Sequence, residues 1–284
     1  MHTTLITAET LQALLNSSPP PMVFDCSFEL TDPAKGRAQY EEQHIPGARH
    51  ADLNLHLSTH GGGASEGRHP LPSRDQFTAW LGEVGLTPAH QVVVYDRQGA
   101  NHCGRLWWML KWVGHEAVAV LDGGLPAWLA TGAPTESGTG PAPVPATDYP
   151  LRAALVKTID TASLVKRIGQ PNLTIVDARA SARFRGEVEP LDPVAGHIPG
   201  ALNRPFSDNL QPDGRFKPAD VLQAEFKALL AGRDAHGVVH QCGSGVSAIP
   251  NLLAMELAGL GRSTLYPGSW SAWCNTPGTP RAKS

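Results

Sequence analysis

The stretch His236-Gly-Val-Val-His-Gln-Cys-Gly-Ser-Gly-Val-Ser-Ala-Ile-Pro250 indicates the fold and places one reactive side chain in it. Val238 and Val239 are β-branched and bounded by glycine, which is typical of a short buried strand. Cys242 follows that strand, and the apolar run over residues 252–257 predicts a helix. We therefore expect a strand, a tight glycine-rich turn and a helix, with Cys242 at the start of the turn.

This turn is a setting in which a cysteine becomes a nucleophile. Gly243 and Gly245 let the backbone curl, so that successive N–H groups converge on the sulfur and form a small anion site. The start of the following helix adds the positive end of its dipole. Both effects favour thiolate over thiol, and the thiolate is the nucleophile. A lone cysteine is more often a buried structural residue, but this combination favours a reactive one.

Three landmarks occur twice in the chain, in the same order and at similar spacing. They are a short apolar strand ending in aspartate, the pentapeptide His-Ile-Pro-Gly-Ala, and a segment ending in Ala-Trp. The pairs are Val23–Ser27 with Ile175–Arg179, His44–Ala48 with His197–Ala201, and Leu121–Trp128 with Tyr266–Trp273. Such a duplication indicates two globular domains, because the repeats of a solenoid have periods of roughly 20–50 residues.

Each copy alternates predicted strands and helices, which is the pattern of α/β domains with mostly parallel sheets. We expect strands at 22–25, 91–95, 118–121, 174–177, 237–241 and 264–266, and helices at 7–15, 74–82, 103–112, 126–129, 162–168, 219–231 and 247–258. Between the copies, a segment rich in Gly, Pro, Ser and Thr predicts an extended linker. The expected division is an N-terminal domain over 1–133, a linker over 134–150 and a C-terminal domain over 151–284.

The composition disfavours several classes of partner and of metal site. The 284 residues carry 23 Lys and Arg against 26 Asp and Glu, a net charge of −3, without a basic stripe. This disfavours nucleic-acid and membrane-surface binding. The four cysteines form no C-x-x-C pair, which disfavours zinc and iron–sulfur sites and fits a reduced protein. No apolar run approaches the ~20 residues of a membrane span, and the N-terminus lacks a signal-peptide pattern, so we expect a cytoplasmic protein.

The doubled His-Ile-Pro-Gly-Ala, the terminal Gly268-Ser-Trp-Ser-Ala-Trp273 and the loop Cys242-Gly-Ser-Gly-Val-Ser247 resemble the two-domain rhodanese family of sulfurtransferases over nearly the whole chain. The resemblance implies two tandem rhodanese-like domains, each a mostly parallel sheet flanked by helices. The uncharged loop is similar to that of 3-mercaptopyruvate sulfurtransferases, whereas thiosulfate-specific members tend to carry basic residues there. In the first copy, the strand ending at Tyr95 runs into Asp96 at the position of the cysteine. Because Asp96 cannot carry a persulfide, only the C-terminal domain is expected to be catalytic.

The resemblance further implies sulfur transfer through a persulfide on Cys242. Its thiolate takes the outer sulfur of a donor, either 3-mercaptopyruvate or thiosulfate, and cyanide, a small thiol or thioredoxin then accepts that sulfur. This is ping-pong covalent catalysis that needs no metal or organic cofactor. The backbone of the loop residues is expected to bind the donor and to stabilise thiolate and persulfide. These residues are Gly243, Gly245, Val246 and Ser247.

Three further site residues follow from the resemblance. Arg183 lies where the family has its donor-binding arginine, and a guanidinium matches a planar carboxylate with two parallel N–H donors. Ser244 is expected to assist proton transfer to the leaving carbon. The family pairs this serine with a histidine from the other domain, and His69 in His69-Pro-Leu-Pro72 fits that motif. The plainer interpretations are an ion-paired surface arginine and a solvent-exposed histidine in a proline-rich loop.

Other polar residues near these motifs are expected to be structural. Arg179 follows the strand that ends in Asp177 and is expected to form an ion pair. His44, His197 and His240 are expected to be packed, the first two beside a proline turn and the third in a strand.

Two departures from the 3-mercaptopyruvate pattern keep thiosulfate open as the donor. The aspartate that usually precedes the histidine is matched by Asn54, and a second arginine usual after a Glu-Pro pair is matched by Leu191. A single arginine binds a carboxylate less tightly than two. Two other functions fit less well. A cysteine phosphatase needs an arginine six residues after its cysteine, where this chain has Ala248, and the intact Cys242 loop argues against an inactive binding module.

Overall fold

The computed structural model describes residues 1–142, 145–146 and 148–284. The chain forms two compact units, each assembled from separate stretches of sequence. Unit 1 comprises Met1–Ser58, Pro72–Leu155 and Pro212–Phe216, and unit 2 comprises Thr59–Leu71, Val156–Gln211 and Lys217–Ser284. The linker expected over 134–150 includes residues 143, 144 and 147, which lie outside the described residues. Glu136, in its first part, forms an antiparallel bridge with His44 of unit 1.

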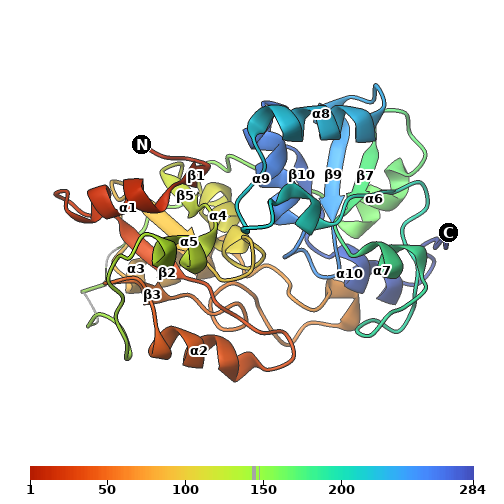
Figure 1. Cartoon of the computed structure of the whole chain (residues 1–284). Helices are drawn as coiled ribbons and strands as arrows, with labels where there is room; N and C mark the ends of the chain where they lie inside the picture. The colour runs from red at the N-terminus through yellow and green to blue at the C-terminus, as the bar shows by residue number, and fades with distance from the viewer. Residues whose placement is uncertain (143–144, 147) are drawn as a thin grey trace. The chain divides into compact units, whose positions relative to one another are not determined.

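Unit 1 is a five-stranded parallel sheet in the order β1-β5-β4-β2-β3, with helices on both faces (Figure 1). A core on one face joins α1 and α5 to the sheet, while α4 packs on β4 and β5. Its strands are β1 (Leu5–Ile6), β2 (Met22–Asp25), β3 (Arg49–His50), β4 (Val92–Tyr95) and β5 (Val118–Leu121). Its helices are α1 (Ala8–Leu15), α2 (Pro33–Glu42), α3 (Arg74–Glu83), α4 (Cys103–Trp112) and α5 (Gly124–Ala130).

Unit 2 repeats this topology with the strand order β6-β10-β9-β7-β8, again all parallel (Figure 1). Its strands are β6 (Lys157–Thr158), β7 (Thr174–Asp177), β8 (Leu202–Asn203), β9 (Val238–Gln241) and β10 (Thr264–Leu265). Its helices are α6 (Thr161–Arg167), α7 (Ser181–Arg185), α8 (Ala219–Leu230), α9 (Ile249–Leu257) and α10 (Ser269–Asn275). Short 3₁₀ turns, η1 (Ala64–Glu66), η2 (Phe206–Asn209) and η3 (Ala235–Gly237), complete it. The identical strand order confirms the duplication and the α/β class.

The doubled His-Ile-Pro-Gly-Ala motif is structural in both units. His44 Nδ1 lies 2.7 Å from the carbonyl oxygen of Tyr40, and the two rings stack with centroids 4.1 Å apart. His197 Nδ1 lies 2.8 Å from the carbonyl oxygen of Phe184, and these rings stack at 4.0 Å. Because a carbonyl only accepts, Nδ1 is the donor in both histidines. The prediction that they are packed is confirmed.

Most predicted elements match the structure, and the differences have local causes. The elements at 22–25, 103–112, 118–121 and 174–177 have the predicted bounds. Helix α9 begins at Ile249 and not at Ser247, because Pro250 belongs to its first turn and the residues before it form the loop. Helix α6 begins one residue early because the side chain of Asp160 accepts the N–H of Ser163 at 2.7 Å.

Several elements were not predicted. Helix α2 carries mostly polar residues and buries only Gly36 and Tyr40, so it has no apolar periodicity to detect. The two-residue strands at the sheet edges are too short for an alternating pattern. No helix in the described part of the chain is long and apolar enough to cross a bilayer.

Alternate residues of β9 serve opposite faces of the unit 2 sheet. Val239 packs in the core formed with α6 and α10, which contains Trp270 and Trp273. His240 faces α8 and α9, where its Nε2 lies 3.0 Å from the sulfur of Met255. The imidazole is fully buried, and burial lowers the pKa of His240 to about 3, with a smaller contribution from the charge of Arg204. The prediction that His240 is packed is confirmed.

Burial of neutral His240 gives a pH-dependent stability. An unfolded histidine titrates near 6.5, so between pH 6.5 and about 3 the unfolded chain binds the proton that the folded chain excludes. The contribution of neutral His240 to the free energy of unfolding is therefore fully present above pH 6.5 and is lost as the pH falls. We expect His240→Leu to reduce the slope of the free energy of unfolding by up to about 1.4 kcal/mol per pH unit between pH 6 and 4. Urea unfolding over this range measures it. His236→Leu, at an exposed position four residues earlier, is the matched control, because it removes a histidine without changing the buried site.

Candidate active site

Cys242 directly follows β9, whose neighbours are β7 and β10, and its side chain is only 2% exposed. Its N–H donates to Ser269 Oγ at 3.1 Å, and its carbonyl accepts the N–H of Trp270 at 3.0 Å. The carbonyl of Gly243 accepts the N–H of Ser271 at 2.8 Å. The start of α10 therefore binds the first two carbonyls of the loop and holds the turn beside the carboxyl ends of the strands, where α/β proteins place their sites.

The equivalent loop of unit 1 binds a carboxylate. Helix α4 begins seven residues after Asp96, as α9 does after Cys242. The Asp96 carbonyl accepts the N–H of Leu125 at 3.0 Å, as the Cys242 carbonyl does from Trp270. The Asp96 carboxylate accepts four backbone N–H groups at 2.8–3.1 Å. Their residues are Gln98, Ala100, His102 and Cys103. In unit 1 the turn thus forms an anion site of backbone donors, which a carboxylate fills.

The structure brings His69 and Ser244 together. His69 Nδ1 lies 2.8 Å from Ser244 Oγ, and both side chains are buried. His69 was expected to come from the N-terminal domain, but its segment Thr59–Leu71 belongs to unit 2. The backbone N–H of Arg68 donates to Ser271 Oγ at 3.1 Å, which fastens this segment to α10. The plainer interpretation of His69 as a solvent-exposed histidine is therefore wrong.

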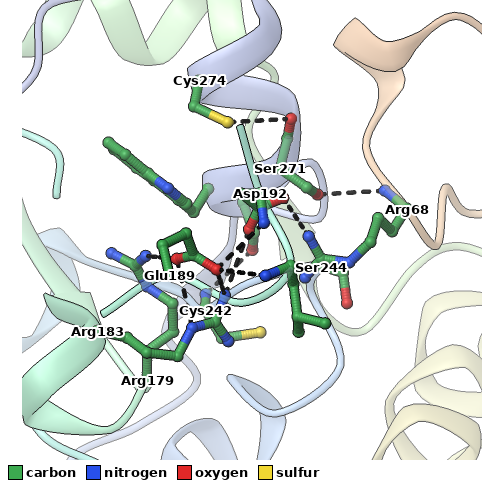
Figure 2. A network of polar contacts seen from close by, with 12 residues as sticks. Arg68, Arg179, Arg183, Glu189, Asp192, Cys242, Ser244, Ser271 and Cys274 are labelled. Carbon is green, nitrogen blue, oxygen red and sulfur yellow. Dashed lines mark hydrogen bonds and ion pairs between the residues drawn. The ribbon is translucent and has the colours of Figure 1, made fainter. Parts of the chain in front are cut away.

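A network of arginines and carboxylates lies beside the Cys242 loop (Figure 2). Arg183 contacts Glu189 at 2.6 Å and Asp192 at 3.3 Å, and its side chain is 18% exposed. Burial alone would raise the pKa of Glu189, but its hydrogen bond and ion pair with Arg183 lower it, so the carboxylate is ionised. If Ala or any larger residue replaced Gly243, its Cβ would lie 3.5 Å from Arg183 Nη1. Arg183 therefore lies against the residue that follows Cys242.

Arg179 is structural, as predicted. It contacts Asp177 at 2.7 Å and Glu189 at 3.4 Å, and its guanidinium stacks over Trp270 at 4.9 Å. It is 3% exposed, so its charge is committed to the interior of unit 2. By contrast, Arg185 pairs with Glu187 on the surface.

Two residues of this network were missed by the sequence analysis, Arg68 and Asp192. Arg68 forms an ion pair with Asp192, whose other oxygen contacts Arg183 (Figure 2). Leu191, examined as the position of a second arginine, is 40% exposed, whereas the next residue is buried in the network. The sequence held one signal that could have identified Arg68, namely its position directly before His69.

The other predicted site residues lie in the Cys242 loop, whereas Asn54 lies elsewhere. Gly243, Gly245 and Val246 are buried and Ser247 is half-buried, all between β9 and α9. Asn54 belongs to unit 1, where its N–H donates to the Asp52 carboxylate at 2.8 Å.

The remaining cysteines are buried and free, as is Cys242. Burial raises the pKa of Cys26 and Cys103, and the nearby charges of Asp25 and Asp96 raise it further. Burial also raises the pKa of Cys274. These three thiols are therefore held protonated and are poor nucleophiles.

Among the described residues no cluster of three or more His, Cys, Asp or Glu side chains has the arrangement of a metal site. A cavity of 730 Å³ in unit 2 is lined by residues that include Lys157, Asp160, Tyr266 and Gly268, but not by Cys242. We assign that cavity no part in the chemistry of Cys242.

The model of the rhodanese-like domain matches residues 7–131 and again 160–276. The chain belongs to the rhodanese family. Its two matches agree with the duplicated sheets, so this rhodanese-family protein has two tandem domains of that kind.

Relatives of this rhodanese-family protein include sulfurtransferases that differ in donor. It is 46% identical over 98% of its length to a Pseudomonas aeruginosa protein named "Probable 3-mercaptopyruvate sulfurtransferase", of which 97% is covered. It is 38% identical to a Mycobacterium tuberculosis protein named "Putative thiosulfate sulfurtransferase SseB", with 97% and 95% of the chains covered. The crystal structure of Escherichia coli SseA, described as a 3-mercaptopyruvate sulfotransferase, matches with a TM-score of 0.79, 30% identity and coverages of 95% and 99%.

Gly245 lies too close to the backbone of Pro267 to admit a side chain. Its φ is +76°, and a Cβ there would lie 2.2 Å from the carbonyl oxygen of Pro267. We expect Gly245→Ala to lower the free energy of unfolding by roughly 3 kcal/mol or more, because backbone must move to admit the methyl group. Gly200→Ala is the matched control, since Gly200 has φ +78° with no atom within 4 Å of the added Cβ. It should cost only about 1–2 kcal/mol for the left-handed conformation. Equal losses in urea unfolding would contradict a clash at Gly245.

Proposed function

We propose that this protein is a sulfurtransferase that moves a sulfur atom from 3-mercaptopyruvate to an acceptor through a persulfide on Cys242. The observation that carries the proposal is the pair of equivalent loops. In unit 1 four backbone N–H groups bind the Asp96 carboxylate, and in unit 2 a loop of the same length starts at Cys242. Donors placed in this way stabilise a thiolate and the persulfide anion that replaces it without reorganising.

In the first half-reaction the Cys242 thiolate attacks the donor sulfur. The new S–S bond forms as the C–S bond of 3-mercaptopyruvate breaks, and the electron pair of that bond moves to the carbon as the enolate of pyruvate. This carbon needs a proton. Ser244 Oγ, 2.8 Å from His69 Nδ1, supplies one, and the His69–Ser244 pair is then reprotonated from solvent. Arg183 binds the donor carboxylate.

In the second half-reaction an acceptor removes the outer sulfur. A thiolate attacks it to give a new persulfide and the free Cys242 thiolate, while cyanide gives thiocyanate. With a dithiol such as thioredoxin, the second thiol displaces hydrosulfide and a disulfide forms. This ping-pong scheme uses one nucleophile and no cofactor.

Thiosulfate is the second candidate donor. It is a dianion, and two guanidinium groups, those of Arg183 and Arg68, lie beside Gly243. Its leaving group is sulfite, which needs no proton at carbon, so the His69–Ser244 pair has no task with this donor. The presence of that buried pair favours 3-mercaptopyruvate.

We further propose that the protein works in a reducing compartment, the cytoplasm. All four cysteines are free and buried, and the mechanism needs Cys242 as a thiolate at the start of each cycle.

The persulfide itself is directly measurable. After incubation with 3-mercaptopyruvate and no acceptor, mass spectrometry should find about 32 Da, one sulfur, added to the peptide that contains Cys242. Cys242→Ser should abolish both the adduct and turnover. Single serine variants of Cys26, Cys103 and Cys274 are the controls and should keep the adduct, since burial holds these groups as thiols. An unmodified Cys242 would refute the proposed function.

The two donors should respond differently to loss of Ser244. We expect Ser244→Ala to lower kcat with 3-mercaptopyruvate by about 10²-fold, because the leaving carbon loses its proton source. Turnover of thiosulfate to sulfite by the same variant should change little. Ser247→Ala, in the same loop, is the control, because only the backbone of Ser247 is assigned to donor binding and the substitution leaves that backbone in place. The wild type should prefer 3-mercaptopyruvate; a preference for thiosulfate of more than about tenfold in kcat/KM would reverse the assignment of the donor.

A further inference from the structure

A second guanidinium lies beside the Cys242 loop. A Cβ built on Gly243 would lie 2.8 Å from Arg68 Nη2, nearer than the 3.5 Å to Arg183 Nη1. Both arginines thus reach the residue next to the nucleophile, one from the segment before His69 and the other from α7. Both keep partly exposed side chains, 26% for Arg68 and 18% for Arg183.

The backbone of Arg68 is fixed relative to the loop. Its N–H donates to Ser271 Oγ, and the N–H of Ser271 donates to the carbonyl of Gly243. The next residue, His69, contacts Ser244. Arg68 is therefore tied to the loop in two ways, through Ser271 to Gly243 and through its neighbour His69 to Ser244.

The side chain of Arg68 already binds a carboxylate. Asp192 lies between the two arginines, with Oδ1 on Arg68 and Oδ2 on Arg183 (Figure 2). The Nε of Arg68 is buried and has no hydrogen-bond partner. A buried donor without an acceptor is costly, and an anion beside Gly243 would relieve that cost. Asp192 is a positioning residue that holds both guanidinium groups at the loop.

We propose that Arg68 is a donor-recognition residue, which binds the carboxylate of the sulfur donor together with Arg183. The inference rests on the proposed function and names the second arginine of its binding site. It also removes one departure noted in the sequence, because Arg68 supplies from another segment the cation that is missing at Leu191. Two forked guanidiniums select a planar carboxylate over an uncharged ketone.

Binding to an unreactive variant tests this without turnover. Cys242→Ser removes the nucleophile, and calorimetry then gives the Kd of 3-mercaptopyruvate. In this background Arg68→Met should raise the Kd about tenfold or more, since a charge-assisted contact is lost. The Kd of 1-mercapto-2-propanone, which lacks the carboxylate, should not change. Arg185→Met is the matched control, because Arg185 pairs with Glu187 on the surface, and it should leave both values unaltered.

Each other outcome overturns the inference. An unchanged Kd in Arg68→Met, equal losses for both ligands, or no binding of 3-mercaptopyruvate by Cys242→Ser would each exclude carboxylate recognition by Arg68. If Arg68→Met does not fold, Arg68→Gln takes its place with the same criteria. The proposed function is judged separately by the Cys242 persulfide of the wild type, so the two can fail independently.

Discussion

In unit 1 the turn between the central strand β4 and helix α4 directs four backbone N–H groups at one place. An anion inside the chain, the Asp96 carboxylate, accepts all four. In unit 2 the turn has the same length but begins with Cys242. The proposed function gives the Cys242 thiolate and persulfide the place that a carboxylate occupies in the other copy.

On the proposed function, this constraint explains why only the copy with Cys242 carries a site. A carboxylate in the turn is permanently bound and cannot exchange, whereas a sulfur can accept and release a second sulfur. The surroundings of Cys242 follow the same logic. The loop carbonyls are bound by the start of α10, and Arg68, Arg183, Glu189 and Asp192 form a charged network next to Gly243. The carboxylates balance the arginines, so that the cations are held in place without being left unpaired in a buried setting.

Local sequence signals predicted the α/β class, the duplication and most helices and strands, because apolar periodicity and caps act within a few residues. Strands such as β2 and β7 carry enough apolar residues to be identified, while α2 does not, since its residues are mostly polar. Pro250 moved the start of α9 by two residues, which shows that a single residue near a terminus decides the boundary. Cys242, Ser244, His69 and Arg183 were all named from the sequence, and the structure brings His69 to Ser244 and Arg183 to the loop.

The sequence by itself determined that this protein has two copies of one α/β fold and that only one copy has a cysteine at the strand-to-helix turn. Those features are written in short, contiguous motifs. Only the tertiary structure decided that Thr59–Leu71 belongs to unit 2 and that Arg68 joins Asp192 and Arg183 beside the Cys242 loop. The reason is that these contacts join residues more than a hundred positions apart, and no periodicity or local propensity encodes which distant side chains meet.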